Sequence, residues 1–171
     1  MRRYALPYWA NQIPLIIQLG YDVHLLDGGV MLAARETKDP ETAAIKDVVL
    51  KTWGAWNSRV ANNGVPYFRN AAEDMFFDYC PLRFDNFKEY MAGTQTYLNT
   101  LSAQGIKEKE IRVERVGNTA WVVGTYTVDS ESNAGEHFHV EGGRYTGILV
   151  KVDSRWLVCH EHWSPPAPPA A

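Results

Sequence analysis

The stretch Arg144–Ser164, RYTGILVKVDSRWLVCHEHWS, reads with a period of two on either side of Asp153-Ser154. Side chains two residues apart on a strand share one face of a sheet, whereas Asp and Ser favour turns. The stretch therefore predicts two antiparallel neighbours, the strands Phe138–Val152 and Arg155–Ser164, joined by a short turn.

Two further strands are predicted before this pair. The segments Ile106–Val116 and Thr119–Val128 show the same period of two, and Gly117-Asn118 between them is a typical tight turn. The loop Ser130–Gly135 leads to the next strand. Because these connections are short, the four strands are expected to form an antiparallel meander.

The region before the meander begins with a predicted helix. Asp39 can cap free backbone amides and Pro40 suits the first helical position, so the helix is expected to start here and to end at Asn63-Gly64. Its apolar residues follow the helical period at Ile45, Val48, Val49, Trp53, Trp56 and Val60.

A short strand and a second helix complete the pattern. The strand is predicted over Glu73–Cys80, followed by a helix that Asp85 caps and Gly105 ends. Helices followed by strands predict an α+β fold with a helical layer on one sheet face. Residues 1–38 are expected to form an arm outside this fold, and the Pro/Ala-rich residues 166–171 a flexible tail.

The composition limits the function classes. A chain of 171 residues with 46% hydrophobic residues fits one domain with a substantial core. Its net charge of −3 gives no basic excess, so we expect no nucleic-acid partner. No apolar run is long enough to span a bilayer, so we expect no membrane partner. The two cysteines, Cys80 and Cys159, are expected to be buried thiols of a cytoplasmic protein.

The last strand suggests a pocket for a small organic ligand. By simple alternation Trp156, Val158, His160 and His162 share one face, which then has an apolar floor and a polar mouth. Small-molecule sites commonly have this composition.

Arg144 is the second indication of a site, because it shares an otherwise apolar strand face with Thr146. A buried guanidinium is costly unless it meets an acceptor. Arg144 is therefore interpreted either as an anchor for an anionic ligand group or as the ion-pair partner of Asp78 or Glu161.

The order Arg144-Tyr145-Thr146, Trp156 and His160–Ser164 resembles the closing strand pair of the nuclear transport factor 2-like superfamily, especially its SnoaL-like branch. It is also similar to the association domain of calcium/calmodulin-dependent kinase II. The resemblance covers Asp39–Pro165. It implies a cone-shaped, cystatin-like fold in which a curved antiparallel sheet wraps around the long N-terminal helix, with an internal pocket and a homodimer built on the sheet.

Members of this superfamily include isomerases, cyclases, hydrolases, dehydratases and binding modules. The function must therefore be inferred from the residues of the site and not from the fold. In the ketosteroid isomerase branch a carboxylate base lies near the end of the first strand. Tyr79 takes that position here, and Asp78, one residue earlier, is expected on the opposite face.

Acid–base chemistry is therefore expected from His160 or His162, with Tyr79 as hydroxyl donor and Arg144 as anion holder. The expected substrate contacts are Trp53, Trp56, Phe77, Asp78, Trp156 and Thr146. Such a site would serve an isomerase, cyclase or lyase without a cofactor. The alternative is a non-catalytic ligand-binding or oligomerisation module.

Two His-x-His pairs, His137/His139 and His160/His162, give a metal-dependent enzyme as a further alternative. Imidazoles together with Glu141 could hold zinc, iron or nickel. By alternation His137 and His139 face away from Arg144, unless Gly142-Gly143 forms a bulge. We expect no metal.

Overall fold

Two compact units make up the chain, Met1–Asp39 and Pro40–Ala171. The computed structural model describes the following residues: 21–26, 29–34, 39–79 and 82–166. In the first unit, β1 (Tyr21–Leu26) pairs antiparallel with β2 (Gly29–Ala34), a hairpin that the sequence analysis did not predict. The predicted tail lies outside the described residues from residue 167 onward.

Helix α2 (Pro40–Asn57) begins at the predicted residue but ends before the predicted stop at Asn63-Gly64. The side chain of Asn57 explains the early end. Its Nδ2 donates to the Ile106 carbonyl at 2.9 Å, and its Oδ1 accepts from the Ile106 amide at 2.6 Å. The chain then continues as the short 3-10 helix η2 (Ala61–Tyr67). Contacts with a distant strand thus set the helix length.

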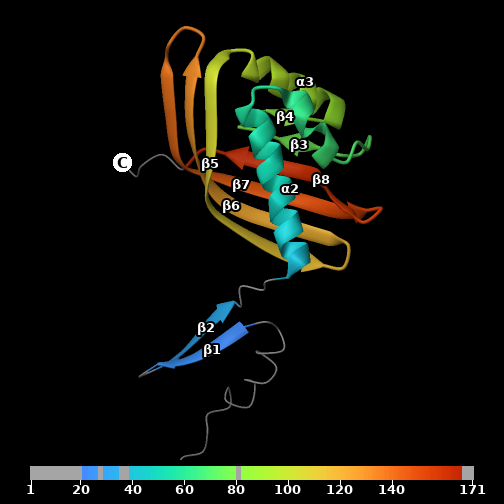
Figure 1. The fold of residues 1–171 in the computed structure, drawn as a ribbon, viewed down its shortest axis with the longest axis vertical. Coiled ribbons are helices and arrows are strands. Elements are labelled where there is room, and N and C mark those ends of the chain that lie inside the picture. The colour runs from blue at the N-terminus through green and yellow to red at the C-terminus, as the bar shows by residue number, and fades with distance from the viewer. Residues whose placement is uncertain (1–20, 27–28, 35–38, 80–81, 167–171) are drawn as a thin grey trace, which may run out of the picture. The chain divides into compact units, whose positions relative to one another are not determined.

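Six strands of the second unit form one curved sheet in the order β4-β3-β8-β7-β6-β5 (Figure 1). Their bounds are β3 Phe76–Phe77, β4 Arg83–Phe84, β5 Leu101–Val116, β6 Thr119–Ser132, β7 His137–Val152 and β8 Arg155–Ser164. The last four strands pair antiparallel in sequence order, which confirms the predicted meander. Strand β3 joins them through a parallel pairing with β8.

The segment before β3 is less regular than predicted. A strand over Glu73–Cys80 is wrong, because only Phe76 and Phe77 pair, and Cys80 lies outside the described residues. The preceding residues form a turn around the buried carboxylate of Asp74, which accepts hydrogen bonds from the Arg69 guanidinium and from the amide of Ala71. This ion pair takes the chain out of the extended conformation.

Helix α3 (Phe87–Leu98) is capped by Asn86 rather than by the predicted Asp85. The Asn86 Oδ1 accepts the Glu89 amide at 2.9 Å, the usual contact of an N-cap. The predicted end at Gly105 is also wrong, because that residue lies inside β5.

Two β-bulges decide which side chains face α2. In β7 the register shifts at Gly142, whose φ of 76° is favourable for glycine. In β8 it shifts at Cys159, so that the residues on either side of it pair with the neighbours Leu149 and Ile148. Alternation changes phase across such a bulge. The buried side chains of β8 are therefore Trp156, Val158, Glu161 and Trp163.

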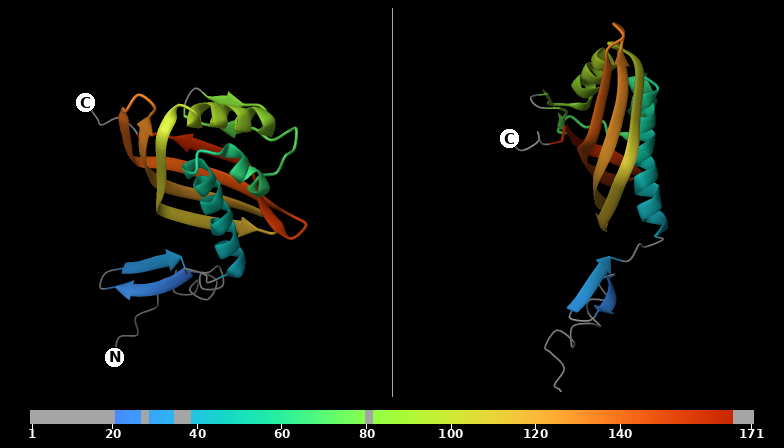
Figure 2. Two further views of the ribbon diagram at one scale, coloured as in Figure 1. Left: turned by 45° about the horizontal axis from the view of Figure 1, so that its top comes forward. Right: turned by 90° about the vertical axis from the view of Figure 1, so that its left-hand side faces the viewer.

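Helix α2 lies along the concave face of the sheet (Figure 2). Aromatic rings fill the space between the two. The ring of Trp53, which is 2% exposed, lies edge-on to Tyr145 at 5.3 Å and to Tyr126 at 5.9 Å. Each such pair contributes about 0.5–1.5 kcal/mol beyond simple burial. The unit thus has the predicted α+β architecture of a curved sheet around a long helix. None of the described helices is long and apolar enough to cross a membrane.

Candidate functional site

A cavity of about 220 Å³ lies inside the curve of the sheet, where α3 and the end of α2 approach β5, β6 and β7. Its aromatic lining consists of Trp56, Tyr79, Tyr90, Tyr97, Phe138 and Trp163. Its polar lining consists of Asp78, Thr94, Gln104 and Ser130. A concave, mostly aromatic wall with a few polar groups is typical of a small-molecule site.

Asp78 is the carboxylate of this cavity, at the point where the chain leaves β3. Its Oδ1 accepts the Tyr79 amide at 2.7 Å. Burial raises the pKa of the Asp78 carboxyl above its ordinary value, while the Tyr79 amide and the charge of His162 lower it in part. The prediction that Asp78 and Tyr79 point in opposite directions is wrong: both line the cavity, because the strand ends at Phe77 and alternation stops there.

Two tyrosine hydroxyls lie close enough for the charge of this carboxylate to act on them. Tyr79 Oη and Tyr126 Oη are 2.8 Å apart, and Tyr126 Oη also lies 3.4 Å from the Ser164 carbonyl. Burial raises the pKa of both phenols, so both stay protonated at neutral pH. When Tyr126 donates to Tyr79, the Tyr79 proton is free to donate into the cavity.

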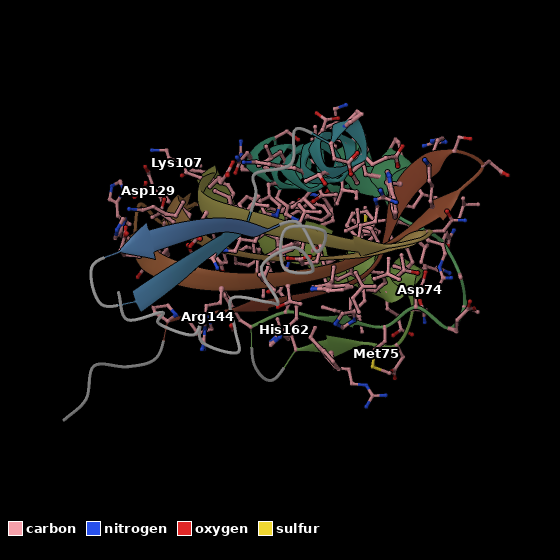
Figure 3. All side chains as sticks on the ribbon, turned by 90° about the horizontal axis from the view of Figure 1, so that it is seen from below. Asp74, Met75, Lys107, Asp129, Arg144 and His162 are labelled. Atoms are coloured by element: carbon pink, nitrogen blue, oxygen red, sulfur yellow. The ribbon has the colours of Figure 1, made fainter. Side chains whose placement is uncertain are left out.

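Arg144 lies on the outer face of the sheet, away from α2 (Figure 3). Thr146, two residues further along β7, shares that face. Both are exposed, and Arg144 Nη2 donates to the Pro165 carbonyl at 3.3 Å. Among the described residues Arg144 forms no ion pair, so the interpretation with Asp78 or Glu161 as its partner is wrong. The intervening Tyr145, 1% exposed, occupies the inner face instead.

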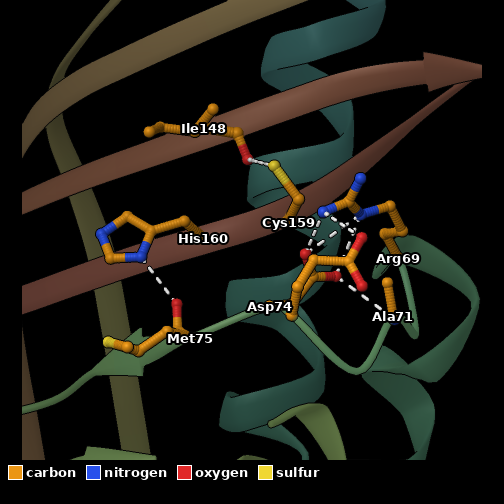
Figure 4. A network of polar contacts seen from close by, with 8 residues as sticks. Arg69, Ala71, Asp74, Met75, Ile148, Cys159 and His160 are labelled. Carbon is orange, nitrogen blue, oxygen red and sulfur yellow. Dashed lines mark hydrogen bonds and ion pairs between the residues drawn. The ribbon is translucent and has the colours of Figure 1, made fainter. Parts of the chain in front are cut away.

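His160 and His162 also face outward, because the bulge at Cys159 reverses the alternation that sequence analysis assumed. His160 Nδ1 contacts the Met75 carbonyl at 2.7 Å, next to the Arg69–Asp74 ion pair (Figure 4). Neither histidine lines the cavity, and the predicted orientation of both is wrong.

The remaining predicted contacts lie in three places: the cavity, the core and the outer face of the sheet. Trp56 lines the cavity. Trp53 lies in the core beneath it, and Trp156 Nε1 donates to Glu41 at 2.7 Å. Phe77 packs edge-on against the rings of both outer histidines of β8, at 5.5 and 6.1 Å.

The other histidine pair lies on the outer face of β7. The bulge at Gly142 places His137 and His139 on the same face as Arg144, both exposed. His139 Nδ1 lies 2.6 Å from Asp129 Oδ1, and this contact lowers the pKa of that carboxyl. Within the described residues no three His, Cys, Asp or Glu side chains group as a metal site.

Glu161 has a role that the sequence analysis did not predict, since it considered this residue only as a partner of Arg144. It is completely buried and accepts hydrogen bonds from Tyr90, from Tyr145 at 3.1 Å and from Trp163 Nε1 at 3.0 Å. Burial raises the pKa of Glu161 to about 7, although the three donors oppose this. Tyr90 and Trp163 also line the cavity, so Glu161 supports its wall from behind. Its two neighbours in the sequence, His160 and His162, are polar and gave no local signal that Glu161 is buried.

Comparison with known proteins agrees with this geometry. The family model described as SnoaL-like domain matches residues 66–168. No curated protein sequence matches the chain.

Three solved structures illustrate the similarity of the fold. A nuclear transport factor 2-like superfamily protein from Salmonella enterica has a TM-score of 0.72 and 16% identity, over 78% of this chain and 96% of that one. A candidate dehydratase of the same family from Streptomyces avermitilis has a TM-score of 0.69 and 13% identity, over 77% of this chain and 100% of that one. A candidate calcium/calmodulin-dependent kinase II association domain from Thiobacillus denitrificans has a TM-score of 0.62 and 10% identity, over 71% of this chain and 94% of that one.

At these sequence identities the solved structures support the fold alone. The family model, in contrast, covers more than half of the chain. The chain therefore belongs to the SnoaL-like family, and its fold is that of nuclear transport factor 2-like proteins.

Proposed function

We propose that the cavity binds a small neutral organic molecule and that Asp78 moves a proton at one of its carbon atoms. The protein would then be an isomerase or a lyase whose proton transfer uses its own side chains. The observation that carries this proposal is geometric: a single carboxyl, Asp78, and the ring of Tyr79 line the same aromatic cavity, where burial raises the pKa of the carboxyl. A base whose pKa is raised toward neutrality suits proton transfer near pH 7.

The chemistry follows from the two groups. The Asp78 carboxylate takes a proton alpha to a carbonyl, and the hydroxyl of Tyr79 donates a hydrogen bond to the enolate oxygen that develops. Return of the proton from Asp78 to another carbon gives isomerisation, whereas its transfer to a β-hydroxyl, which leaves as water when the C–O bond breaks, gives elimination. The name of the Streptomyces avermitilis protein, a candidate dehydratase, favours elimination.

The ligand is proposed to be neutral because of the charges around the cavity. Of the described residues that line it, none is Arg, Lys or His, and Asp78 is the only acid. An anionic substrate would meet an acidic group without a compensating cation. This revises the expectation that Arg144 holds an anionic group.

Deuterium exchange tests the proposal without knowledge of the natural substrate. The full chain is incubated in D2O with 2-tetralone, a neutral bicyclic ketone, and loss of its α-proton signals is followed by NMR. We expect Asp78→Asn to slow the enzyme-dependent exchange roughly a hundredfold or more. Arg144→Gln and His160→Gln, both on the outer face, are controls expected to keep the wild-type rate. Exchange that survives in Asp78→Asn, or is absent in the wild type, contradicts the proposal.

A non-catalytic association module is the second candidate, and the outer face of the sheet favours it. Four large apolar side chains are exposed there: Val116 (68%), Trp121 (42%), Val123 (43%) and Val152 (41%). We infer that a second copy of the chain covers this patch, giving the expected homodimer. Light scattering should report a dimer for the wild type and a monomer for Trp121→Lys. Val60→Lys changes an equally exposed apolar residue elsewhere and should remain dimeric.

A further inference from the structure

Two buried polar atoms in the cavity wall have no hydrogen-bond partner among the residues that the structure describes. Thr94, on α3, is 8% exposed, and its Oγ1 is buried without a partner among the described residues. Gln104 lies on β5 opposite Ser130, and its Oε1 is likewise buried without a partner among the described residues. Both residues line the cavity. The third such atom, Trp53 Nε1, belongs to the core and not to the cavity lining.

Unpaired polar atoms in a folded interior call for an explanation, because nearly all buried polar groups in native proteins are hydrogen-bonded. Leaving one unpaired costs the desolvation of that group. Two of them in the wall of one cavity indicate that a bound molecule supplies the missing partners.

The chemistry of these two atoms specifies the partner. Gln104 Oε1 only accepts hydrogen bonds, whereas the Thr94 hydroxyl both donates and accepts. A ligand hydroxyl matches this combination, since its proton can go to Gln104 while its oxygen accepts from Thr94. An ether oxygen cannot donate, a carboxylate would also face Asp78, and an ammonium group cannot accept from Thr94.

We propose that Thr94 and Gln104 form the polar anchor of the cavity and bind the hydroxyl of a neutral, hydroxylated aromatic molecule. This inference rests on the proposed function in taking the cavity as the ligand site. At the packing density of protein interiors, about 220 Å³ holds roughly ten to fifteen non-hydrogen atoms, the size of a bicyclic ring system. The rings of Trp56, Tyr97 and Trp163 offer aromatic faces and edges to such a ligand.

Calorimetric titration of the full chain with four probes on one framework tests the anchor. The probes are 2-naphthol, 2-methoxynaphthalene, 2-naphthoate and 2-naphthylmethylamine, which differ in the group presented to the anchor. We expect 2-naphthol to bind roughly three- to tenfold more tightly than the methoxy probe, the range of one neutral hydrogen bond. The carboxylate and the amine should bind more weakly than 2-naphthol.

Variants connect the preference with the two side chains. Thr94→Val and Gln104→Leu should each reduce the preference for 2-naphthol over the methoxy probe to about twofold or less, whereas Thr94→Ser keeps the hydroxyl and the preference. Thr96→Val, at an exposed position of the same helix, is the matched control. Circular dichroism verifies that each variant folds.

Three results would contradict the proposal that Thr94 and Gln104 bind a ligand hydroxyl. The first is that Thr94→Val and Gln104→Leu both keep the wild-type preference for 2-naphthol over the methoxy probe. The others are that the amine or the carboxylate probe binds most tightly, or that no probe binds. Binding is measured without turnover, so the anchor can succeed while the deuterium exchange of 2-tetralone fails. The protein would then be a ligand-binding module with the same anchor.

Discussion

The buried carboxyl of Glu161 predicts an unusual dependence of stability on pH. Its pKa is raised from 4.5 to about 7 in the folded chain, mainly because burial disfavours the charged form. Between these two values the folded chain binds more protons than the unfolded chain. The free energy of unfolding therefore falls as pH rises through this window, the opposite of a salt-bridged carboxylate.

The magnitude follows from the two pKa values. Each pKa unit corresponds to about 1.4 kcal/mol, so between pH 5 and pH 8 the ionisation of Glu161 removes about 2 to 3 kcal/mol of stability. Glu161→Gln cannot ionise and keeps a similar shape. We expect the free energy of unfolding of the wild type, relative to this variant, to fall by that amount over the same range.

Urea unfolding at constant ionic strength, measured at pH 5, 6, 7 and 8, gives this difference directly. Glu114→Gln, an exposed position on β5, is the control and should follow the wild type at every pH. Tyr145→Phe removes one donor to Glu161 and should extend the falling window to higher pH. If the free energy of unfolding of the wild type, relative to Glu161→Gln, stays constant or rises with pH, the three donors outweigh burial and the reasoning is refuted.

Three further predictions concern local packing and capping. Gly143→Ala should destabilise the fold by about 1–3 kcal/mol, because its Cβ would lie 2.4 Å from the buried Tyr126 ring. Gly54→Ala, on α2 with open space around its Cβ, should stabilise by about 0.5–1 kcal/mol, and thermal unfolding of this pair compares the two effects. Asn86→Ala should cost about 1 kcal/mol in urea unfolding through loss of the cap on the Glu89 amide. An unchanged midpoint for Gly143→Ala or Asn86→Ala, or a lowered one for Gly54→Ala, would contradict them.

Periodicity predicted the strands well because it is a local property. The bounds predicted for β8, Arg155–Ser164, agree with the structure, and so does the order of the meander. The start of α2 at Pro40 was likewise encoded locally, by a cap followed by proline. Its end was not, because the hydrogen bonds of Asn57 to Ile106 depend on tertiary contact.

The site was predicted less well, because a side chain's face depends on register. One extra residue at Cys159 turns His160 and His162 outward and brings Glu161 inward. The Gly142-Gly143 pair indicated a bulge in β7, but no comparable signal marks the one in β8. Tyr79 and Trp56 line the cavity, and the position of neither depends on the phase of that strand.

The central claim, that the small-molecule site is the inner cavity and not the outer face of the sheet, can be tested by NMR of the tryptophan indole N–H groups. Trp56 and Trp163 line the cavity, whereas Trp121 is exposed on the outer face. Titration of the full chain with 2-naphthol should move the Trp56 and Trp163 signals in a saturable manner and leave the Trp121 signal in place. Movement of Trp121 while the two cavity signals stay unchanged would contradict the account.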